Sequence, residues 1–504
     1  MKRDISAKHN FRRKSNDQQS GTFRKMGYEL IDRIADLIEE VGDGPVTRGE
    51  AADVVQDALD SKRSLPAKGT DPENLLRRAA DLLFEHSLYN GHPKFWGYIT
   101  SSPLPMGMLG DLLASAVNAN VGAWALSPMA SEMERQAVRW IGEFMGYPSG
   151  GGLMVSGGNM ANYIGFLAGM RSIAGEKIRT RGINPQDEKL ICYCSEQTHT
   201  WVYKAADLFG IGTDNIRWIA TDDSHAMDLR VLTETITADI EKGYRPFIVI
   251  GTAGSVSIGV VDPLAGIRRI CDQYGLWFHI DGAYGGFAAA LPEFEPEITG
   301  LAEADSVAVD PHKWLYAPLE AGCVLVKDPK CLTDAFSYHP PYYNFEDSVV
   351  NFVDYGMQNS RGFRALKVWL SLQQLGLDGY KKLIREDIML AEKAYELFDQ
   401  QQDFDAVTWH LSIATFRYIP ADLRQRISSD SVAEYLNVLN KEILNRIQAG
   451  GKYFISNAVI NEAYVLRLCI VNFRTTIDDI EDFPAFVKGV GVEADNLLRK
   501  QHIG

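Results

Sequence analysis

A lysine stands directly after a short apolar run in the segment SVAVDPHKWLY, residues 306–316. The alternation of Val307 and Val309 predicts a strand, which the Asp-Pro-His that follows should end. Lysine seldom enters a protein interior unless its amine is paired with an anion or used chemically. Lys313 is therefore a candidate reactive residue, since its ε-amine can form an imine with a carbonyl compound.

A carboxylate ends a second apolar strand, in the segment LWFHIDGAYGG. Asp281 lies one strand–helix–strand passage before Lys313, and a buried carboxylate needs a cationic partner. An aspartate that caps a turn is the alternative interpretation. The small residues Gly282 and Ala283 favour a flat ligand that lies close to the backbone.

A glycine-rich turn joins a strand to a helix in the segment GLMVSGGNMANYIGF. Gly157 and Gly158 let the backbone approach a ligand, and the following helix N-terminus offers unpaired N–H groups to an anion. The pattern indicates a phosphate site, although such turns are also common without a ligand. His199, just after the predicted strand LICYC, is a further candidate, but a lone histidine is more often structural.

These candidates should converge, because ligands of parallel α/β sheets bind beyond the carboxyl ends of the strands. Pyridoxal 5'-phosphate requires an anion site, a partner that keeps its ring nitrogen protonated, and a lysine that bonds to its aldehyde. The sequence offers one motif for each requirement. It therefore predicts a pyridoxal-phosphate site.

The segments VDPHKWLY, FHIDGAYGG, SGGNMAN and SEQTHTWVYKAA resemble the signatures of the group II pyridoxal-phosphate-dependent amino-acid decarboxylases. This family includes aromatic-L-amino-acid, histidine and glutamate decarboxylases, and the similarity extends from residue 70 to beyond residue 370. The resemblance implies an α/β protein of fold type I, like aspartate aminotransferase, with a mostly parallel seven-stranded sheet. It also implies an N-terminal helical segment, a small α+β C-terminal domain, and a homodimer with shared active sites.

The resemblance implies roles around the cofactor ring. Lys313 would form the Schiff base, and Asp281 would pair with the pyridinium nitrogen. Ala283 would pack against one ring face, and His199 would stack on the other, near the substrate carboxylate. Lys313, Asp281 and His199 are thus expected catalytic residues.

Other positions match family residues around the phosphate. The implied phosphate ligands are Gly157, Gly158, Asn159 and His312. Ser255 matches a family serine or threonine near the cofactor. Asp310 departs from the usual asparagine, and its carboxylate would repel a phosphate unless it points elsewhere.

The resemblance and the aromatic residues around it indicate four residues on the substrate side of the site. Ser101 matches a family threonine near the substrate carboxylate, and Tyr98 and Trp124 could line an aromatic pocket. The loop YHPPYYNFEDSVVNFVDYG matches the mobile loop that reaches the neighbouring subunit's site. Tyr342 in this loop is the expected catalytic proton donor, with Tyr343 beside it as the alternative.

The expected reaction is decarboxylation of an L-amino acid to its amine and CO2, with tyrosine, DOPA, phenylalanine or tryptophan as the substrate. An aldehyde synthase of the same family is one alternative, and a carbon–carbon lyase of the sphingosine-phosphate type is another. The retained lysine, aspartate and histidines argue against a homologue without activity. No cluster of residues predicts a metal site.

Alternating helices and strands should position these residues. The segments KLICYC, RPFIVIGTA and LWFHIDGAY have strand character, and helical patterns such as SEMERQAVRWIGEFMG lie between them. We expect a basic, disordered tail over 1–25, and a helical segment over 26–104 that packs on the other subunit. A large cofactor-binding domain would cover 105–385 and a smaller domain 386–504.

Composition limits the partners. The 504 residues carry a net charge of −15, which argues against nucleic-acid binding. We find no apolar stretch long enough for a bilayer and no signal peptide, so we expect no membrane partner. Six dispersed cysteines are typical of reduced thiols in a cytoplasmic protein.

Overall fold

The computed structural model describes residues 18–184, 188–339 and 348–502. The chain divides into two compact units, one formed by residues 1–89 with 449–452 and the other by residues 90–448 with 453–504. Among the described residues, no helix combines the length and the apolar character that a bilayer crossing requires.

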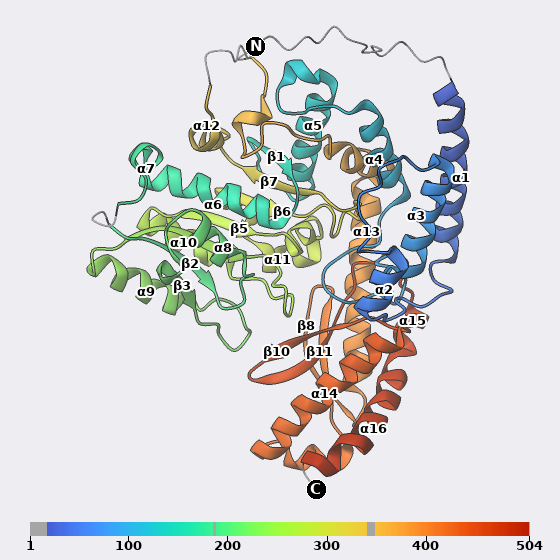
Figure 1. The fold of residues 1–504 in the computed structure, drawn as a ribbon. Coiled ribbons are helices and arrows are strands. Elements are labelled where there is room, and N and C mark those ends of the chain that lie inside the picture. Colours follow the sequence, from blue (N-terminus) through green and yellow to red (C-terminus); the bar gives the residue numbers. More distant parts are fainter. Residues whose placement is uncertain (1–17, 185–187, 340–347, 503–504) are drawn as a thin grey trace. The chain divides into compact units, whose positions relative to one another are not determined.

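The first unit contains three helices, α1 (Gln18–Glu40), α2 (Ala52–Leu59) and α3 (Pro72–His86) (Figure 1). The side chain of Asp71 caps α3 by accepting from the N–H of Asn74, as the sequence predicts. Helix α1 already begins at Gln18, so the last residues of the predicted tail over 1–25 are helical. The ion pair between Lys25 and Glu73 (2.6 Å) joins α1 to α3 and gives this polar stretch a folded partner.

The second unit is built on a seven-stranded sheet with the order β1-β7-β6-β5-β4-β2-β3. The strands are β1 (Gly151–Val155), β2 (Leu190–Ser195), β3 (Ile216–Ile219), β4 (Arg245–Thr252), β5 (Trp277–Asp281), β6 (Ser306–Val309) and β7 (Gly322–Val326). All neighbours pair in parallel except β7, which is antiparallel to both β1 and β6. The predicted fold class, a mostly parallel seven-stranded sheet, is confirmed.

Helices surround this sheet, and α6 crosses one face of it (Figure 1). The helices up to the last strand are α4 (Pro105–Val117), α5 (Pro128–Phe144), α6 (Gly158–Ala174), α7 (Glu176–Arg181), α8 (Trp201–Leu208), α9 (Leu229–Glu241), α10 (Leu264–Tyr274) and α11 (Glu295–Ile298). After β7 follow α12 (Lys330–Phe336) and the long α13 (Ala365–Asp399). The strands are almost wholly buried, which explains why they appear in the sequence as continuous apolar runs.

A four-stranded antiparallel sheet, in the order β10-β11-β9-β8, forms the C-terminal part. Its elements are β8 (Phe404–His410), β9 (Ile413–Tyr418), α14 (Asp430–Gly450), β10 (Ser456–Ile460), β11 (Ala463–Cys469), α15 (Ile477–Glu481) and α16 (Phe483–His502). The boundary expected at residue 385 falls inside α13, because that helix continues past its kink at Gly376 to Asp399.

Candidate active site

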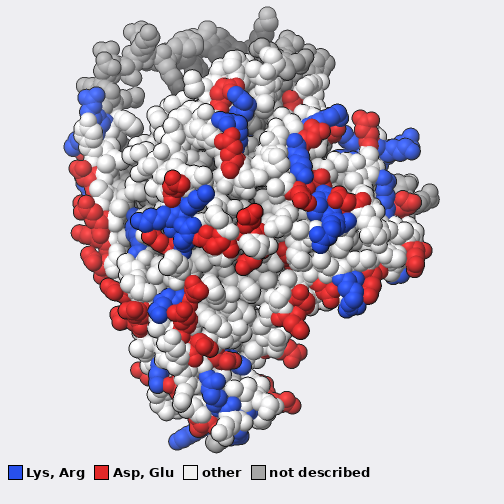
Figure 2. Space-filling view, turned by 180° about the vertical axis from the view of Figure 1, so that it is seen from behind, with Lys and Arg blue, Asp and Glu red and all other residues white. Residues whose placement is uncertain are grey.

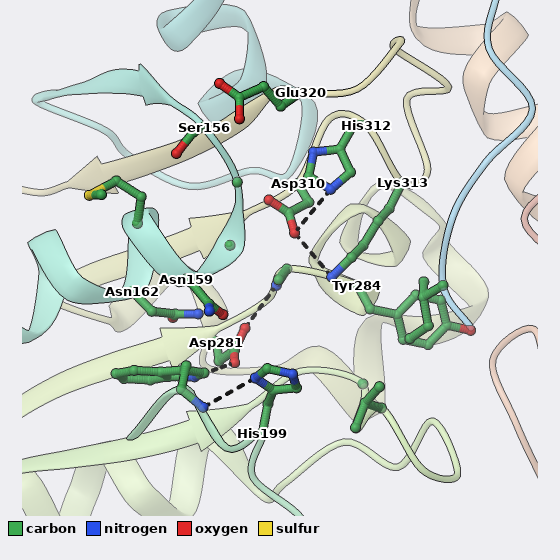
Figure 3. A pocket seen from close by; sticks show the side chains of 18 of the residues that line it. Ser156, Asn159, Asn162, His199, Asp281, Tyr284, Asp310, His312, Lys313 and Glu320 are labelled. Atoms are coloured by element: carbon green, nitrogen blue, oxygen red, sulfur yellow. Dashed lines mark hydrogen bonds and ion pairs between the residues drawn. The ribbon is translucent and has the colours of Figure 1, made fainter. Parts of the chain in front are cut away.

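A cavity of about 620 Å³ opens at the carboxyl ends of the central strands. Strands β1 and β6 run in the same direction because each is antiparallel to β7, so β1, β2, β5 and β6 all end at this edge. The four predicted motifs follow these strands. Their side chains meet in the cavity, with Lys313 and Asp310 on one side and Asp281 and His199 on the other (Figure 3).

Lys313 lies in a tight turn after β6, in which its backbone N–H donates to the carbonyl of Asp310. Its ammonium group lies 3.0 Å from Asp310 Oδ2, and His312 Nε2 lies 3.6 Å from the same oxygen. Only 18% of the Lys313 side chain is exposed. The hydroxyl of Ser101 donates to the His312 carbonyl (2.8 Å) and so holds the turn from outside.

Asp281 is buried at the end of β5, and two donors fix its carboxylate. The Trp201 indole Nε1–H donates to Oδ2 (2.7 Å), and the backbone N–H of Ala283 donates to Oδ1 (3.1 Å). His199 lines the same end of the cavity, and its Nδ1 accepts from the N–H of Trp201 (3.2 Å). Partial burial is the main cause that lowers the pKa of His199, and it outweighs the opposing charge of Asp281.

The glycine turn after β1 lies beside the turn that carries Lys313. Gly157 has a φ of 147°, which favours glycine, and α6 begins at Gly158. A Cβ atom on Gly158 would lie 2.7 Å from Asp310 Oδ2 and 3.1 Å from the Ala283 side chain. The first turn of α6 thus approaches the cavity closely enough for its backbone N–H groups to face a bound anion.

The residues present fit pyridoxal phosphate. A helix N-terminus suits its phosphate, Asp281 suits its ring nitrogen, and Lys313 suits its aldehyde. The loop after β4 supplies the buried hydroxyl of Ser255, which has no hydrogen-bond partner among the described residues. Its neighbours Gly254 and Val256 line the cavity, so an acceptor on a bound ligand could satisfy that hydroxyl.

Most of the predicted cofactor ligands line this cavity: Gly157, Gly158, Asn159, His199, Asp281, Ala283, His312 and Lys313. The predicted substrate residues do not join them in the single chain. Tyr98 is 61% exposed beside Phe454, and Trp124 donates to Glu132 (3.1 Å). The hydroxyl of Ser101 is engaged by the His312 carbonyl, and Tyr342 lies outside the described residues.

The sequence analysis missed four side chains that line the cavity or lie behind it. Trp201 lies within a recognised motif, but no local pattern indicates that its indole reaches β5. Asn162 lines the cavity, and its Oδ1 accepts from His279 Nε2 (2.7 Å). The Ser306 hydroxyl oxygen accepts from the Trp277 indole (2.9 Å), and the same hydroxyl forms a hydrogen bond with His279 Nδ1 (2.8 Å). Burial lowers the pKa of His279 to about 4. A usable signal was its position two residues before Asp281, on the same face of a strand.

Comparison with known proteins gives consistent matches. The pyridoxal-dependent decarboxylase conserved domain matches residues 58–419. An aromatic-L-amino-acid decarboxylase from Bacillus atrophaeus is 32% identical over 476 residues, covering 93% of this chain and 95% of that protein. A phenylacetaldehyde synthase from a Rosa hybrid cultivar is 30% identical over 466 residues, covering 89% of each. The crystal structure of Oryza sativa TDC with PLP and tryptamine has a TM-score of 0.87 and 25% identity, covering 96% of this chain and 99% of that one.

Proposed function

The chain belongs to the pyridoxal-dependent decarboxylase family, and we propose from that premise that it converts an aromatic L-amino acid into its amine and CO2. It is a pyridoxal-phosphate-dependent carboxy-lyase whose substrate is a small molecule, an amino acid. The observation that supports the proposal most is the meeting of Lys313, Asp281 and the Gly157–Gly158 turn in one cavity. An aromatic side chain is favoured because the relatives with high coverage are named for aromatic substrates or products.

The bound cofactor supplies an electron sink for the charge left on the α-carbon when CO2 departs. In the proposed arrangement Lys313 holds the cofactor covalently, and Asp281 keeps the ring nitrogen protonated, with Trp201 fixing the carboxylate. His199 and Ala283 would lie against the two ring faces. Because its pKa is lowered, His199 is mostly neutral at pH 7 and adds no second positive charge beside the ring.

The remaining predicted residues keep their proposed roles. Asn159 and His312 contact the phosphate together with the glycine turn, and Ser255 offers its hydroxyl to the cofactor. Ser101, Tyr98 and Trp124 contribute to the substrate side. Tyr342, outside the described residues, is proposed to protonate the α-carbon after CO2 has left.

We propose a homodimer in which each subunit completes the other's site. One face of α4 supports this, because Leu109, Leu112, Leu113 and Val117 recur at helical spacing and each is about half exposed or more, between 49% and 62%. Tyr98 and Trp124 lie outside the cavity of their own chain, which is consistent with a role across such an interface. The helical segment over 26–104 is proposed to pack on the partner.

We propose a cytoplasmic location and no nucleic-acid partner. All six cysteines are buried and unpaired, as expected in a reducing compartment. Acidic and basic side chains are interspersed on the face drawn in Figure 2, and the net charge of −15 disfavours a polyanion.

The test is a screen of the purified, cofactor-loaded enzyme against the standard amino acids and DOPA, with CO2 and amine both quantified. The proposal expects turnover of one or more aromatic amino acids, with one amine formed for each CO2. Turnover confined to glutamate, aspartate or histidine would contradict the aromatic assignment.

An aldehyde synthase is the second candidate, favoured by the 30% identity to a phenylacetaldehyde synthase. That reaction consumes O2 and water and yields aldehyde, CO2, ammonia and hydrogen peroxide. Oxygen uptake equal to CO2 release would establish it and would exclude simple decarboxylation.

A further inference from the structure

Asp310 places a carboxylate at the wall of the cavity, between the Lys313 turn and the start of α6. Its side chain is 3% exposed. The oxygen Oδ2 lies 3.0 Å from Lys313 Nζ and 3.6 Å from His312 Nε2. The same oxygen would lie 2.7 Å from a Cβ on Gly158, so it packs on the first turn of α6 (Figure 3).

The second carboxylate oxygen is not satisfied. Oδ1 of Asp310 is buried and has no hydrogen-bond partner among the described residues. A buried carboxylate oxygen that lacks a donor raises the free energy of the folded protein. Asp310 is therefore poorly explained as a structural anchor, since within the described part of the chain Lys313 is its one close charged partner apart from His312.

Apart from the Lys313 ammonium, the charges of the described residues around the cavity do not offset this carboxylate. Burial lowers the pKa of His312, so its imidazole is mostly neutral at pH 7 despite the nearby aspartate. Glu320 adds a second carboxylate to the cavity wall, although Arg364 lies 3.4 Å from it. A phosphate monoester carries close to two negative charges at neutral pH.

We propose that Asp310 is a positioning residue that limits cofactor affinity, because it holds the Lys313 ammonium and repels the cofactor phosphate. The inference rests on the proposed function, since it takes pyridoxal phosphate to be the ligand. Its consequence is an enzyme that exchanges its cofactor readily and responds to the free cofactor concentration.

Both effects of Asp310, the hold on the Lys313 ammonium and the repulsion of the phosphate, disfavour attachment of the cofactor. The Lys313 ammonium gives up one proton, the amine attacks the aldehyde carbon, and one water leaves as the carbon–nitrogen double bond forms. Lys313 would then no longer pair as an ammonium group with Asp310 Oδ2, and a phosphate held by the first turn of α6 would lie near the same carboxylate. A neutral side chain at position 310 would remove the repulsion and free the amine.

The test measures dissociation constants for the wild type and Asp310→Asn, by absorbance titration of the apoprotein with pyridoxal phosphate at pH 7.5, a pH chosen to keep the phosphate dianionic. We expect the variant to bind at least about ten-fold more tightly, as removal of one nearby charge implies. A higher affinity of Asp310→Asn for pyridoxal phosphate is diagnostic, because a substitution that only damaged the structure would lower the affinity. Glu320→Gln is the matched control: it removes a more exposed, paired carboxylate from the same cavity and should change affinity less.

Two further probes separate the two effects. Inorganic phosphate should protect apo Asp310→Asn against heat more than it protects the wild type, and pyridoxal, which lacks the phosphate, should also bind the variant more tightly. Unchanged or weaker pyridoxal-phosphate binding in Asp310→Asn would overturn the inference.

A measurement on the wild type alone keeps the inference testable if the variant does not fold. Repulsion at the phosphate predicts that pyridoxal phosphate binds no more than about a hundred-fold more tightly than pyridoxal, a modest gain for a dianion. A larger gain would overturn the inference. A wild type that binds no pyridoxal phosphate would instead contradict the proposed function.

Discussion

The Asp281 carboxylate depends on a side chain that lies eighty positions earlier in the chain. The Trp201 indole is 1% exposed and donates to Oδ2, while the Ala283 backbone donates to Oδ1. These two hydrogen bonds orient the Asp281 carboxylate toward the cavity and stabilise its negative charge. Trp201 therefore acts on the cofactor through Asp281.

The variant Trp201→Phe keeps an aromatic ring and removes the N–H donor. A hydrogen bond to a charged group contributes about 1.5–3 kcal/mol, so we expect about a ten- to hundred-fold weaker affinity for pyridoxal phosphate. Absorbance titration of the apoprotein measures this. Trp218→Phe, a half-buried tryptophan on β3 outside the cavity lining, should leave the affinity unchanged. Equal affinity in Trp201→Phe and the wild type would show that the indole does not support Asp281.

The sequence was sufficient to predict Lys313, Asp281 and the glycine turn. Their residue types indicate the chemistry, and each follows an apolar run that predicts a strand. Trp201 could not, because the pattern around it indicates only a helix. Its contact with β5 depends on the parallel order of the strands, which no short segment encodes. The same limit explains Tyr98 and Trp124, which are not among the residues that line the cavity of their own chain.

Helix α6 approaches β5 through glycines rather than through larger side chains. A Cβ on Gly165 would lie 2.6 Å from the His279 ring, and one on Gly169 would lie 2.7 Å from Trp277. This close approach brings Asn162 to His279 and the first turn of α6 to the cavity. The Gly157–Gly158 turn and Asp281 at the end of β5 are thus positioned by the same contact between α6 and β5.

We expect Gly165→Ala to destabilise the protein by about 1–3 kcal/mol, the usual cost of overpacking, and to weaken cofactor binding. Urea unfolding and absorbance titration would measure the two effects. Gly489→Ala in α16 is the control, because a Cβ at this position would meet no described atom within 4 Å apart from its chain neighbours and its own helix backbone. That change should stabilise the protein by about 0.5–1 kcal/mol. If Gly165→Ala left the free energy of unfolding unchanged, the contact between α6 and β5 would be looser than described.

Helix α13 holds the segment after Lys313 through one buried acid. Asp387 Oδ2 accepts from the Trp314 indole (3.0 Å) and the Tyr316 hydroxyl (2.7 Å), and Oδ1 accepts from the Asn472 N–H (3.3 Å). Burial raises the pKa of Asp387 to about 7. The same carboxylate therefore joins α13 to the reactive turn and to the segment after β11.

The raised pKa makes stability depend on pH. In the unfolded chain Asp387 would ionise near pH 4, so between about pH 4 and 7 the folded protein binds more protons than the unfolded chain. This part of the stability is complete at low pH and is lost as pH rises through 7. Asp387→Asn cannot titrate, so its stability relative to the wild type should rise by about 2 kcal/mol from pH 5 to 8. Urea unfolding at several pH values measures the difference.

The neighbouring exposed acid provides the control. Glu386→Gln should follow the wild-type pH dependence, because its side chain lies at the surface. A pH-independent difference between Asp387→Asn and the wild type would contradict the assignment of a titrating buried acid.

The alternation of strands and helices was predictable because buried parallel strands form continuous apolar runs. The extent of α13 was not predictable, since Gly376 with its non-helical φ of 62° divides it near the expected domain boundary and a second helical stretch then continues to Asp399. The start of α1 at Gln18 also escaped prediction, because its first turns are polar and their partners lie on α3.

The single chain leaves an apolar face on α4 in contact with solvent. Burying four such side chains is favourable, at roughly 25 cal/mol for each Å² of apolar surface. We expect the wild type to sediment at twice the chain mass and the double variant Leu112→Glu/Val117→Glu to sediment as a monomer with little activity. Leu497→Glu on α16, equally exposed at 58%, should remain dimeric. A dimeric Leu112→Glu/Val117→Glu would place the interface elsewhere.

The account depends most on one amine as the attachment point of the cofactor. Reduction of the loaded enzyme with borohydride, followed by peptide mass mapping, tests this directly. We predict a single pyridoxyl label, carried by the ε-amine of Lys313 and absent from Lys313→Ala. A label on another lysine, or no label at all in a protein that contains the cofactor, would contradict the assignment of this cavity as the active site.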